Sequence, residues 1–163
     1  MSAMIQEKEV LYKRALEYAA LKHKGQTRFG GEPYITHPVA VADYLREKGY
    51  GTEYLITALF HDLLEDTDAT EEEIEALGGK AVLKSVKLLT KEKNYVMSQY
   101  IAGIKSDEMA FVVKGADRLH NLMTAIDSNN AFKKKYAKES IMWYLDFLPE
   151  IKEAVCNLID SID

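Results

Sequence analysis

The chain has 163 residues, of which 47% are hydrophobic, 10% aromatic and 29% charged, with only 3 prolines and 9 glycines. This composition is typical of a folded globular protein and excludes a disordered or fibrous one, and the length suits a single domain over residues 1–163. The net charge of −5 argues against a nucleic-acid partner, because general nucleic-acid binders are normally basic.

The N-terminus and the apolar runs indicate the compartment. The opening segment MSAMIQEKEV carries charges where a secretory signal has an uninterrupted apolar run. The longest stretch without a charged residue, Asn94 to Ile104, is far shorter than the ~20 apolar residues of a membrane-spanning helix. We therefore expect a cytoplasmic protein with no membrane partner. Cys156 has no second cysteine to pair with, and we expect it to be a small buried residue.

Hydrophobic residues recur at helical spacing almost throughout, and turn signals separate helix-length segments. The sequence therefore predicts an all-α fold, a compact bundle of several helices. The second helix should start at Pro38 with His37 as its cap and stop near Gly49, and the third should run from a Thr52 cap through the apolar segment LITALFHDLLED as a central, buried helix. The other expected helices cover 5–24, a short segment opened by a capping box at Thr70 and ended by Gly78-Gly79, 80–91, 96–105, 107–126, 132–147 and 150–159.

The segment GQTRFGGEPYITHP, residues 25–38, interrupts this helical pattern. It holds three of the nine glycines and two of the three prolines, so it cannot continue a helix. Irregular connections of this kind often carry binding residues, and we expect a binding loop here.

Charge is spread unevenly along the chain. Residues 65–75 include seven acidic side chains and no basic one, whereas residues 13–28 include five basic side chains and one acidic. This asymmetry indicates a cation site paired with an anion site.

The third predicted helix ends in His61, Asp62, Glu65 and Asp66. Residues four apart share a helical face, so His61 should stack over Glu65 and Asp62 over Asp66. Three carboxylates at the end of an apolar helix carry a large desolvation cost unless a cation compensates them, and a divalent metal ion would do so. The alternative is that this helix end is simply solvated.

Two further residues fit the same kind of site. Asp117 interrupts the apolar segment FVVKGADRLHNL, and His37 ends the irregular loop before Pro38. Together with His61 and Asp62 they offer two imidazole nitrogens and two carboxylates, a set suited to Mn²⁺, Fe²⁺ or Zn²⁺. Four such ligands would leave positions for a water molecule or a phosphate oxygen, as hydrolysis requires.

The order His37, His61-Asp62, Asp117 resembles the metal pattern of the HD phosphohydrolase superfamily. The segment HDLLEDT, residues 61–67, narrows the resemblance to the hydrolase domain of RelA/SpoT homologues and to single-domain small alarmone hydrolases. The similarity runs from about Ala15 to Ile126 through AxxxHKGQTR, GEPYITHPVAVA, ALFHDLLEDTDAT and KGADRLHNLMTA. It implies an all-α HD-domain bundle around a metal site.

The resemblance also implies an activity and its residues. It implies hydrolysis of the 3′-pyrophosphate of (p)ppGpp, with a small nucleotide as substrate and Mn²⁺, or another divalent metal, as cofactor. By motif, the metal ligands are His37, His61, Asp62 and Asp117, the water-activating residues are Glu65 and Asp66, and the nucleotide contacts are Arg28, Tyr34 and Asn121.

Each nucleotide contact also has a simpler reading. Arg28 could be an ordinary loop cation, Tyr34 a packing residue and Asn121 a local hydrogen-bonding group. His23 and His120 have no ligand role in the pattern, and we expect them to pack or to support the ligands. Lys24 and Arg118 could face a polyphosphate or be solvated helix charges.

Two departures from the family pattern keep other functions open. Phe29-Gly30 stands where the family loop commonly carries Lys-Ser, and Gly115 stands where a small apolar residue or Leu is usual. The first departure predicts weaker guanine selectivity and favours an alternative, an HD-superfamily phosphatase acting on another nucleotide or NADPH. A catalytically silent nucleotide-binding module is a third possibility. Since the sequence ends at Asp163, without room for a synthetase domain, we expect any alarmone activity to be degradative. The sequence indicates no oligomeric state.

Overall fold

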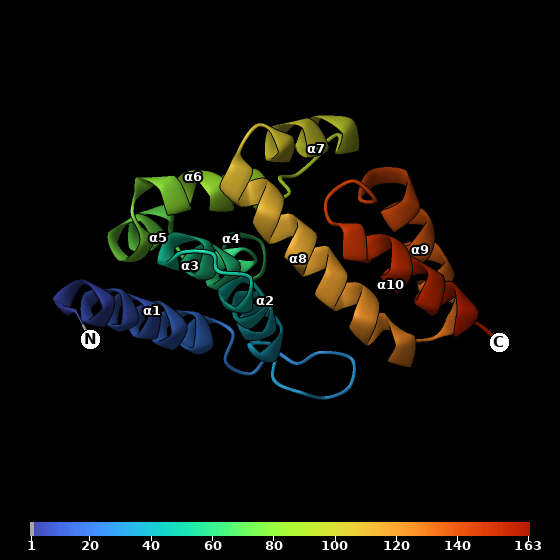
Figure 1. The fold of residues 1–163 in the computed structure, drawn as a ribbon, viewed down its shortest axis with the longest axis horizontal. Helices are drawn as coiled ribbons and strands as arrows, with labels where there is room; N and C mark the ends of the chain where they lie inside the picture. The colour runs from blue at the N-terminus through green and yellow to red at the C-terminus, as the bar shows by residue number, and fades with distance from the viewer. Residues whose placement is uncertain (1) are drawn as a thin grey trace. The chain divides into compact units, whose positions relative to one another are not determined.

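The computed structural model describes residues 2–163, in which all regular secondary structure is helical apart from one isolated antiparallel bridge between Thr27 and Pro33. The all-α prediction is confirmed. The elements are α1 (Ala3–Lys22), α2 (Thr36–Glu47), α3 (Thr52–Phe60), α4 (Leu63–Asp66), α5 (Glu71–Gly78), α6 (Lys80–Leu89), α7 (Met97–Lys105), α8 (Glu108–Thr124), the 3₁₀ turn η1 (Ala125–Asp127), α9 (Asn130–Trp143) and α10 (Pro149–Asp160) (Figure 1).

The chain divides into two compact units. The first ends at Val113, and the second covers Lys114–Asp163, so that α8 begins in one unit and ends in the other. The expectation of a single domain over residues 1–163 stays a prediction. None of the helices described for residues 2–163 combines the length and apolar character needed to cross a bilayer.

The core of the first unit is built around α3. Helices α1, α2, α5 and α6 all contact it, and six consecutive residues, from Leu55 to Phe60, are buried. The prediction of a central buried helix is therefore confirmed. Burying one Leu, Ile or Phe side chain contributes about 1.5 to 3 kcal/mol, so Leu59→Ala should destabilise the fold by about 2 to 5 kcal/mol.

Local signals set several helix boundaries in this unit. Thr70 and Glu73 form the predicted capping box at the start of α5, which satisfies two main-chain donors reciprocally. Gly79 then turns the chain into α6 with a backbone φ of 89°. Residues other than glycine rarely adopt this backbone conformation. Thr52 is the first residue of α3, not its cap, because Gly51 occupies the cap position.

The second unit is held by a buried cation. Arg118, on α8, is only 2% exposed, and its guanidinium carbon lies 4.2 Å from the Tyr136 ring centre and 4.0 Å from the Tyr144 ring centre. Its Nη2 lies 2.6 Å from Glu139 Oε1. Arg118 is therefore neither a phosphate-facing nor a solvated charge, because aromatic faces and one carboxylate replace its water.

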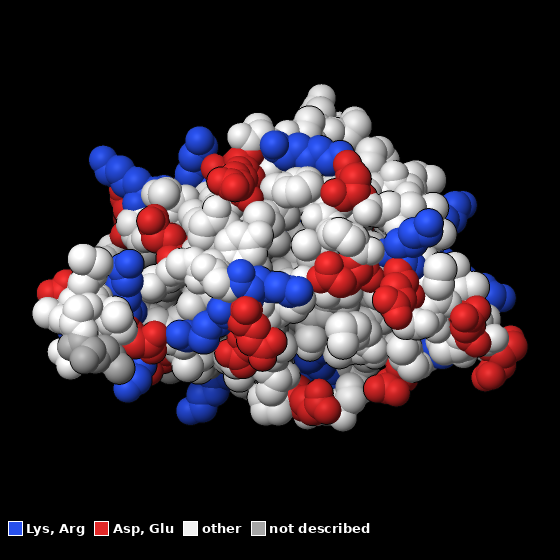
Figure 2. All heavy atoms as spheres, viewed as in Figure 1, with Lys and Arg blue, Asp and Glu red and all other residues white. Residues whose placement is uncertain are grey.

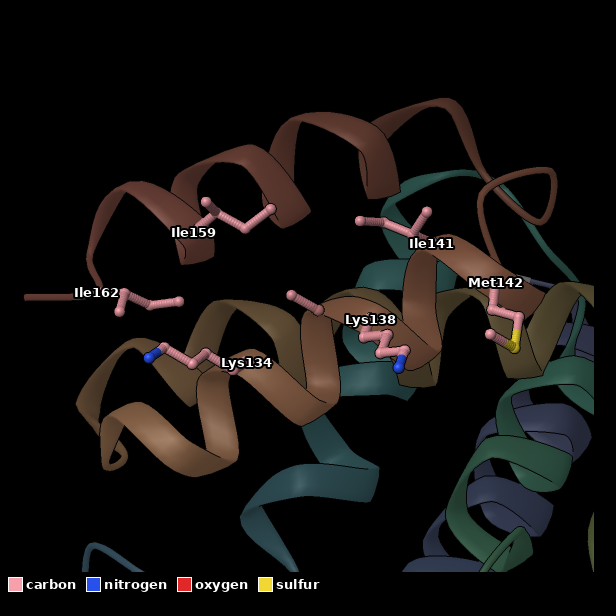
Figure 3. Close-up of a pocket in the computed structure, with 7 residues that line it drawn as sticks. Lys134, Lys138, Ile141, Met142, Ile159 and Ile162 are labelled. Carbon is pink, nitrogen blue, oxygen red and sulfur yellow. The ribbon is translucent and has the colours of Figure 1, made fainter.

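Helices α9 and α10 pack side by side in the second unit and leave an apolar groove of about 450 Å³. Figure 3 shows Ile141 and Met142 on α9, with Ile159 on α10 and Ile162 just beyond its end, and the stems of Lys134 and Lys138 along α9. The expectation for Cys156, also on α10, is wrong, since this side chain is exposed.

Charged side chains of both signs are mixed over the face shown in Figure 2. In the first unit the basic and acidic stretches of the sequence meet directly, because Lys22 Nζ lies 2.9 Å from Asp68 Oδ1. At least one basic and one acidic residue of these two stretches therefore form an ordinary ion pair at the surface.

Candidate metal centre

The His61-Asp62 pair lies where the predicted third helix breaks. Helix α3 ends at Phe60 and the short helix α4 begins at Leu63, with His61 and Asp62 in the turn between them. The prediction of one continuous helix is therefore wrong. His61 Nδ1 lies 2.5 Å from the carbonyl oxygen of Ala58, the group that would accept from the Asp62 N–H if the helix continued. The side chain of His61 thus replaces a helical hydrogen bond.

This contact defines the tautomer of His61. A carbonyl oxygen can only accept, so Nδ1 must carry the proton, and in the neutral ring Nε2 carries the lone pair. Nε2 lies 3.1 Å from Asp62 Oδ2, which brings two acceptor atoms face to face. Either a second ring proton or a cation must separate them. A metal-binding histidine usually has its other nitrogen fixed in this way, and the donor set therefore fits a divalent cation.

His37 brings a second imidazole to the same place. It is 1% exposed, its ring centre lies 5.4 Å from that of His61, and ligand nitrogens of the two rings lie within 4.8 Å of each other. His37 is the second residue of α2 and not its cap, because the cap is Ile35. Helix α2 starts two residues before Pro38. At this start, Thr36 Oγ1 donates a hydrogen bond to the Pro33 carbonyl at 2.8 Å.

Tyr34 links the binding loop to this cluster. Its hydroxyl donates to Asp62 Oδ2, and its ring centre lies 5.9 Å from that of His37. A charge-assisted hydrogen bond of this kind orients the carboxylate. The nucleotide-contact role of Tyr34 stays a prediction, while its contact with Asp62 is a feature that the motif alone did not indicate.

Glu65 and Asp66 form the last turn of the four-residue helix α4. Both residues are exposed, but partial burial of their carboxyl groups is the largest cause that raises the pKa of each, and the charge of Asp62 raises both further. The main-chain N–H of Lys91 donates to Glu65 Oε1 and partly offsets the rise for that residue. Raised pKa values bring both carboxylates nearer to the range in which a general base works well at neutral pH.

Arg28 and Phe29 lie in the loop that leads to Tyr34. The Arg28 N–H donates to the Glu32 carbonyl at 2.8 Å, so the loop folds back on itself, and the Arg28 guanidinium carbon lies 6.0 Å from the Tyr34 ring centre. Phe29 is 65% exposed. An exposed aromatic face in a loop suits stacking against a flat ligand.

The second unit holds the remaining predicted residues. Asp117, on α8, is buried. Its carboxylate receives Lys114 Nζ at 3.0 Å and Asn121 Nδ2 at 3.1 Å. Asn121 therefore orients Asp117 within α8, and its assignment as a nucleotide contact stays a prediction.

Gln26 is a residue whose role the sequence did not reveal. Its Nε2 donates to the main-chain carbonyl of Asp66 at 2.8 Å, and its Oε1 lies 2.8 Å from His23 Nδ1. The only signal was its place inside the HKGQTR segment. His23 is buried, as expected for a supporting residue.

These features agree with the comparisons to known proteins. The HD domain family matches residues 15–147, and the chain belongs to this family. It is 38% identical over 133 residues to the bifunctional (p)ppGpp synthase/hydrolase SpoT of Escherichia coli, covering 75% of this chain and 19% of that protein. It is 40% identical over 141 residues to the guanosine-3′,5′-bis(diphosphate) 3′-pyrophosphohydrolase of Aquifex aeolicus, covering 80% and 20%.

The chain thus spans about a fifth of the length of these curated relatives. A solved structure of similar size has the same fold. It is a metazoan ortholog of SpoT, described as hydrolysing ppGpp and playing a role in starvation responses, and it matches with a TM-score of 0.73 at 24% identity over 99% of this chain and 96% of its own.

Proposed function

We propose that this protein hydrolyses the 3′-pyrophosphate of (p)ppGpp, yielding GDP or GTP and pyrophosphate. The observation that carries the proposal is the pairing of His61 Nε2 with Asp62 Oδ2 at 3.1 Å, beside a buried second imidazole and two carboxylates of raised pKa. The names of the Escherichia coli and Aquifex aeolicus relatives support the choice of substrate.

We propose Mn²⁺ as the cofactor and His37, His61, Asp62 and Asp117 as its ligands. The first three lie in one unit and their donor atoms support the assignment, whereas Asp117 enters on the strength of the family pattern in the sequence. When bound, a divalent cation would acidify water and neutralise phosphate charge. Tyr34 would keep Asp62 in its orientation through the hydroxyl contact.

Glu65 and Asp66 would hold the attacking water and remove its proton. Their raised pKa values make them stronger bases than ordinary carboxylates. The Lys91 N–H fixes the orientation of Glu65, and Gln26 fixes the main chain at Asp66. Arg28 and Phe29 would contact the nucleotide from the loop, with Asn121 as a further contact, through charge pairing, stacking and hydrogen bonding.

A second candidate is a phosphatase that acts on another nucleotide or on NADPH. The exposed Phe29 favours it, because an aromatic face tolerates many bases where a cation would select among them. In that case the product would be orthophosphate.

Product analysis with a panel of nucleotides and Mn²⁺ separates the two candidates. The first predicts pyrophosphate and GDP from ppGpp, and the second predicts orthophosphate from one of the other substrates. Binding of a nucleotide without any turnover would instead indicate a silent binding module.

A further inference from the structure

Lys91 is a half-buried cation at the start of the loop between α6 and α7, and the predicted site residues do not include it. Thr90 caps the C-terminal end of α6, so Lys91 is the first residue beyond that helix. The main-chain N–H of Lys91 donates to Glu65 Oε1. This contact places the start of the loop against the carboxylate that the proposed function assigns to the attacking water.

Two aromatic rings hold the ammonium group of Lys91. Its Nζ lies 5.4 Å from the ring centre of Tyr95 and 5.5 Å from that of Tyr100, within the range of a cation–π interaction. The two ring centres are 5.8 Å apart in an edge-to-face arrangement, and the Tyr100 hydroxyl donates to the Leu89 carbonyl at 2.8 Å. The rings therefore restrict the long lysine side chain, which lowers the entropy that it would lose on binding a ligand.

A tight turn brings Tyr95 back to Lys91. The Tyr95 N–H donates to the Glu92 carbonyl at 3.1 Å. Asn94, within this turn, has a left-handed φ of 63°, which asparagine adopts more readily than most other residues that carry a side chain. The contact between the lysine and the first ring therefore follows from the local fold of the loop.

The Lys91 ammonium has aromatic neighbours but no carboxylate to neutralise it. Within the described range 2–163, no acidic side chain forms an ion pair with its Nζ. Its charge still acts on Glu65. Burial is the largest cause that raises the pKa of Glu65, and the charge of Lys91 acts in the opposite direction. A restrained, half-buried ammonium without an acidic partner is suited to bind an anion such as a phosphate group.

We propose that the Lys91 ammonium binds a phosphate oxygen of the diphosphate group that the protein hydrolyses. This inference rests on the proposed function and adds a substrate contact that the sequence motifs do not assign. The contact with Glu65 sets Lys91 beside the carboxylate that holds the attacking water, and that water attacks a phosphorus atom of the same diphosphate. Lys91 neutralises part of the negative charge of this group, in the substrate and in the pyrophosphate that leaves.

Lys91→Met tests the ammonium group alone. The contact with Glu65 uses the main-chain N–H, so a side-chain substitution leaves it in place, and a methionine side chain can still pack against the two rings. We expect the dissociation constant of pyrophosphate, measured by calorimetric titration at a fixed concentration of free Mn²⁺, to rise ~10-fold or more, because a charge-assisted hydrogen bond is lost. The KM for ppGpp should rise in parallel, whereas the affinity for GDP, which has no 3′-diphosphate, should not change.

Lys93→Met is the matched control, because it removes the same charge from an exposed position in the same loop and should leave pyrophosphate affinity unchanged. Lys91→Arg keeps a cation and should retain most of the affinity. Equal losses in Lys91→Met and Lys93→Met would reveal a general charge effect and overturn the proposal. A normal pyrophosphate affinity in Lys91→Met, with only a lower Tm, would overturn it as well. If Lys91→Met does not fold, Lys91→Gln takes its place.

Binding and turnover are measured separately, so that two failures stay distinct. If the natural protein binds pyrophosphate but does not hydrolyse ppGpp, the proposed function is wrong, while the comparison of Lys91→Met with Lys93→Met still decides whether Lys91 binds the anion. If the natural protein does not bind pyrophosphate, the proposal for Lys91 is wrong whichever substrate the protein hydrolyses.

Discussion

The turn at His61 and Asp62 and the tip of the loop at Phe29 differ in how strongly the fold constrains them. His61 is buried and bonded to the main chain, and the neighbouring Asp62 receives a hydroxyl from a distant residue. In the loop, Phe29 is 65% exposed. Under the proposed function, the buried turn would carry the hydrolytic chemistry and the exposed loop would adjust which nucleotide is accepted.

The largest effect should follow from removing a ligand in the constrained turn. His61→Ala or Asp62→Ala should abolish Mn²⁺ retention and lower turnover by ~10³-fold or more, since a ligand contributes several kcal/mol. We expect the same of Asp117→Ala. Metal content and turnover of each variant are the measurements, and Asp43→Ala, which removes an exposed carboxylate from α2, is the control. Full activity at limiting metal would remove that residue from the ligand set.

Glu65→Gln and Asp66→Asn should separate water activation from metal binding in the same segment. Each keeps the shape of the side chain but removes its basicity, so kcat should fall ~10²- to 10⁴-fold. KM and Mn²⁺ affinity should change much less, as steady-state kinetics and metal titration would reveal. Near-normal kcat in both variants would contradict the assignment of water activation to this pair.

Phe29→Lys tests the exposed loop and should have a smaller effect. If stacking on Phe29 dominates, the natural protein should discriminate between guanosine and adenosine alarmones by less than ~10-fold, because stacking tolerates any base. The lysine variant should widen this gap in kcat/KM. A strong guanine preference that the substitution leaves unchanged would locate selectivity outside the loop.

The smallest expected effect is on the unfolding temperature of the metal-free protein when Asp66 is replaced by Asn. Folding raises the pKa of Asp66, chiefly through burial, so its ionised form destabilises the folded chain at neutral pH. That cost appears as pH rises above the ordinary value of about 4 and is complete above the raised pKa. Asp66→Asn should therefore raise Tm at pH 7 by roughly 1 to 3 °C, a small change because the side chain is partly exposed.

Calorimetry with a chelator at two pH values checks this sign. At pH 3 the carboxyl is protonated in the folded and unfolded chains, so the variant and the natural protein should unfold at similar temperatures. A lower Tm for Asp66→Asn at pH 7 would mean that the carboxylate makes a stabilising contact.

The sequence predicted features that depend on near neighbours in the chain. The capping box at Thr70 needs only residues three apart, and the burial of α3 follows from its apolar composition. The order of the histidines and aspartates indicated the metal site. Such patterns involve near neighbours in the chain or are shared by a whole family, so they can be recognised in the sequence alone.

Other features depended on contacts that the sequence could not reveal. The helix breaks at His61 because its side chain, in place of the Asp62 N–H, bonds to the Ala58 carbonyl. Hydrophobic periodicity cannot predict this competition between a side chain and the main chain. Tyr34 and Asp62 are 28 residues apart. The burial of Arg118 depends on the rings of Tyr136 and Tyr144, which are distant from it in the sequence, so the sequence alone did not predict it.

In the proposed reaction, water attacks the phosphorus joined to the ribose 3′-oxygen. Hydrolysis of ppGpp in H₂¹⁸O with Mn²⁺, followed by mass spectrometry of the products, tests it most directly. We expect one ¹⁸O atom in pyrophosphate and none in GDP. Label in orthophosphate, or in the 3′-hydroxyl of the nucleotide, would contradict it.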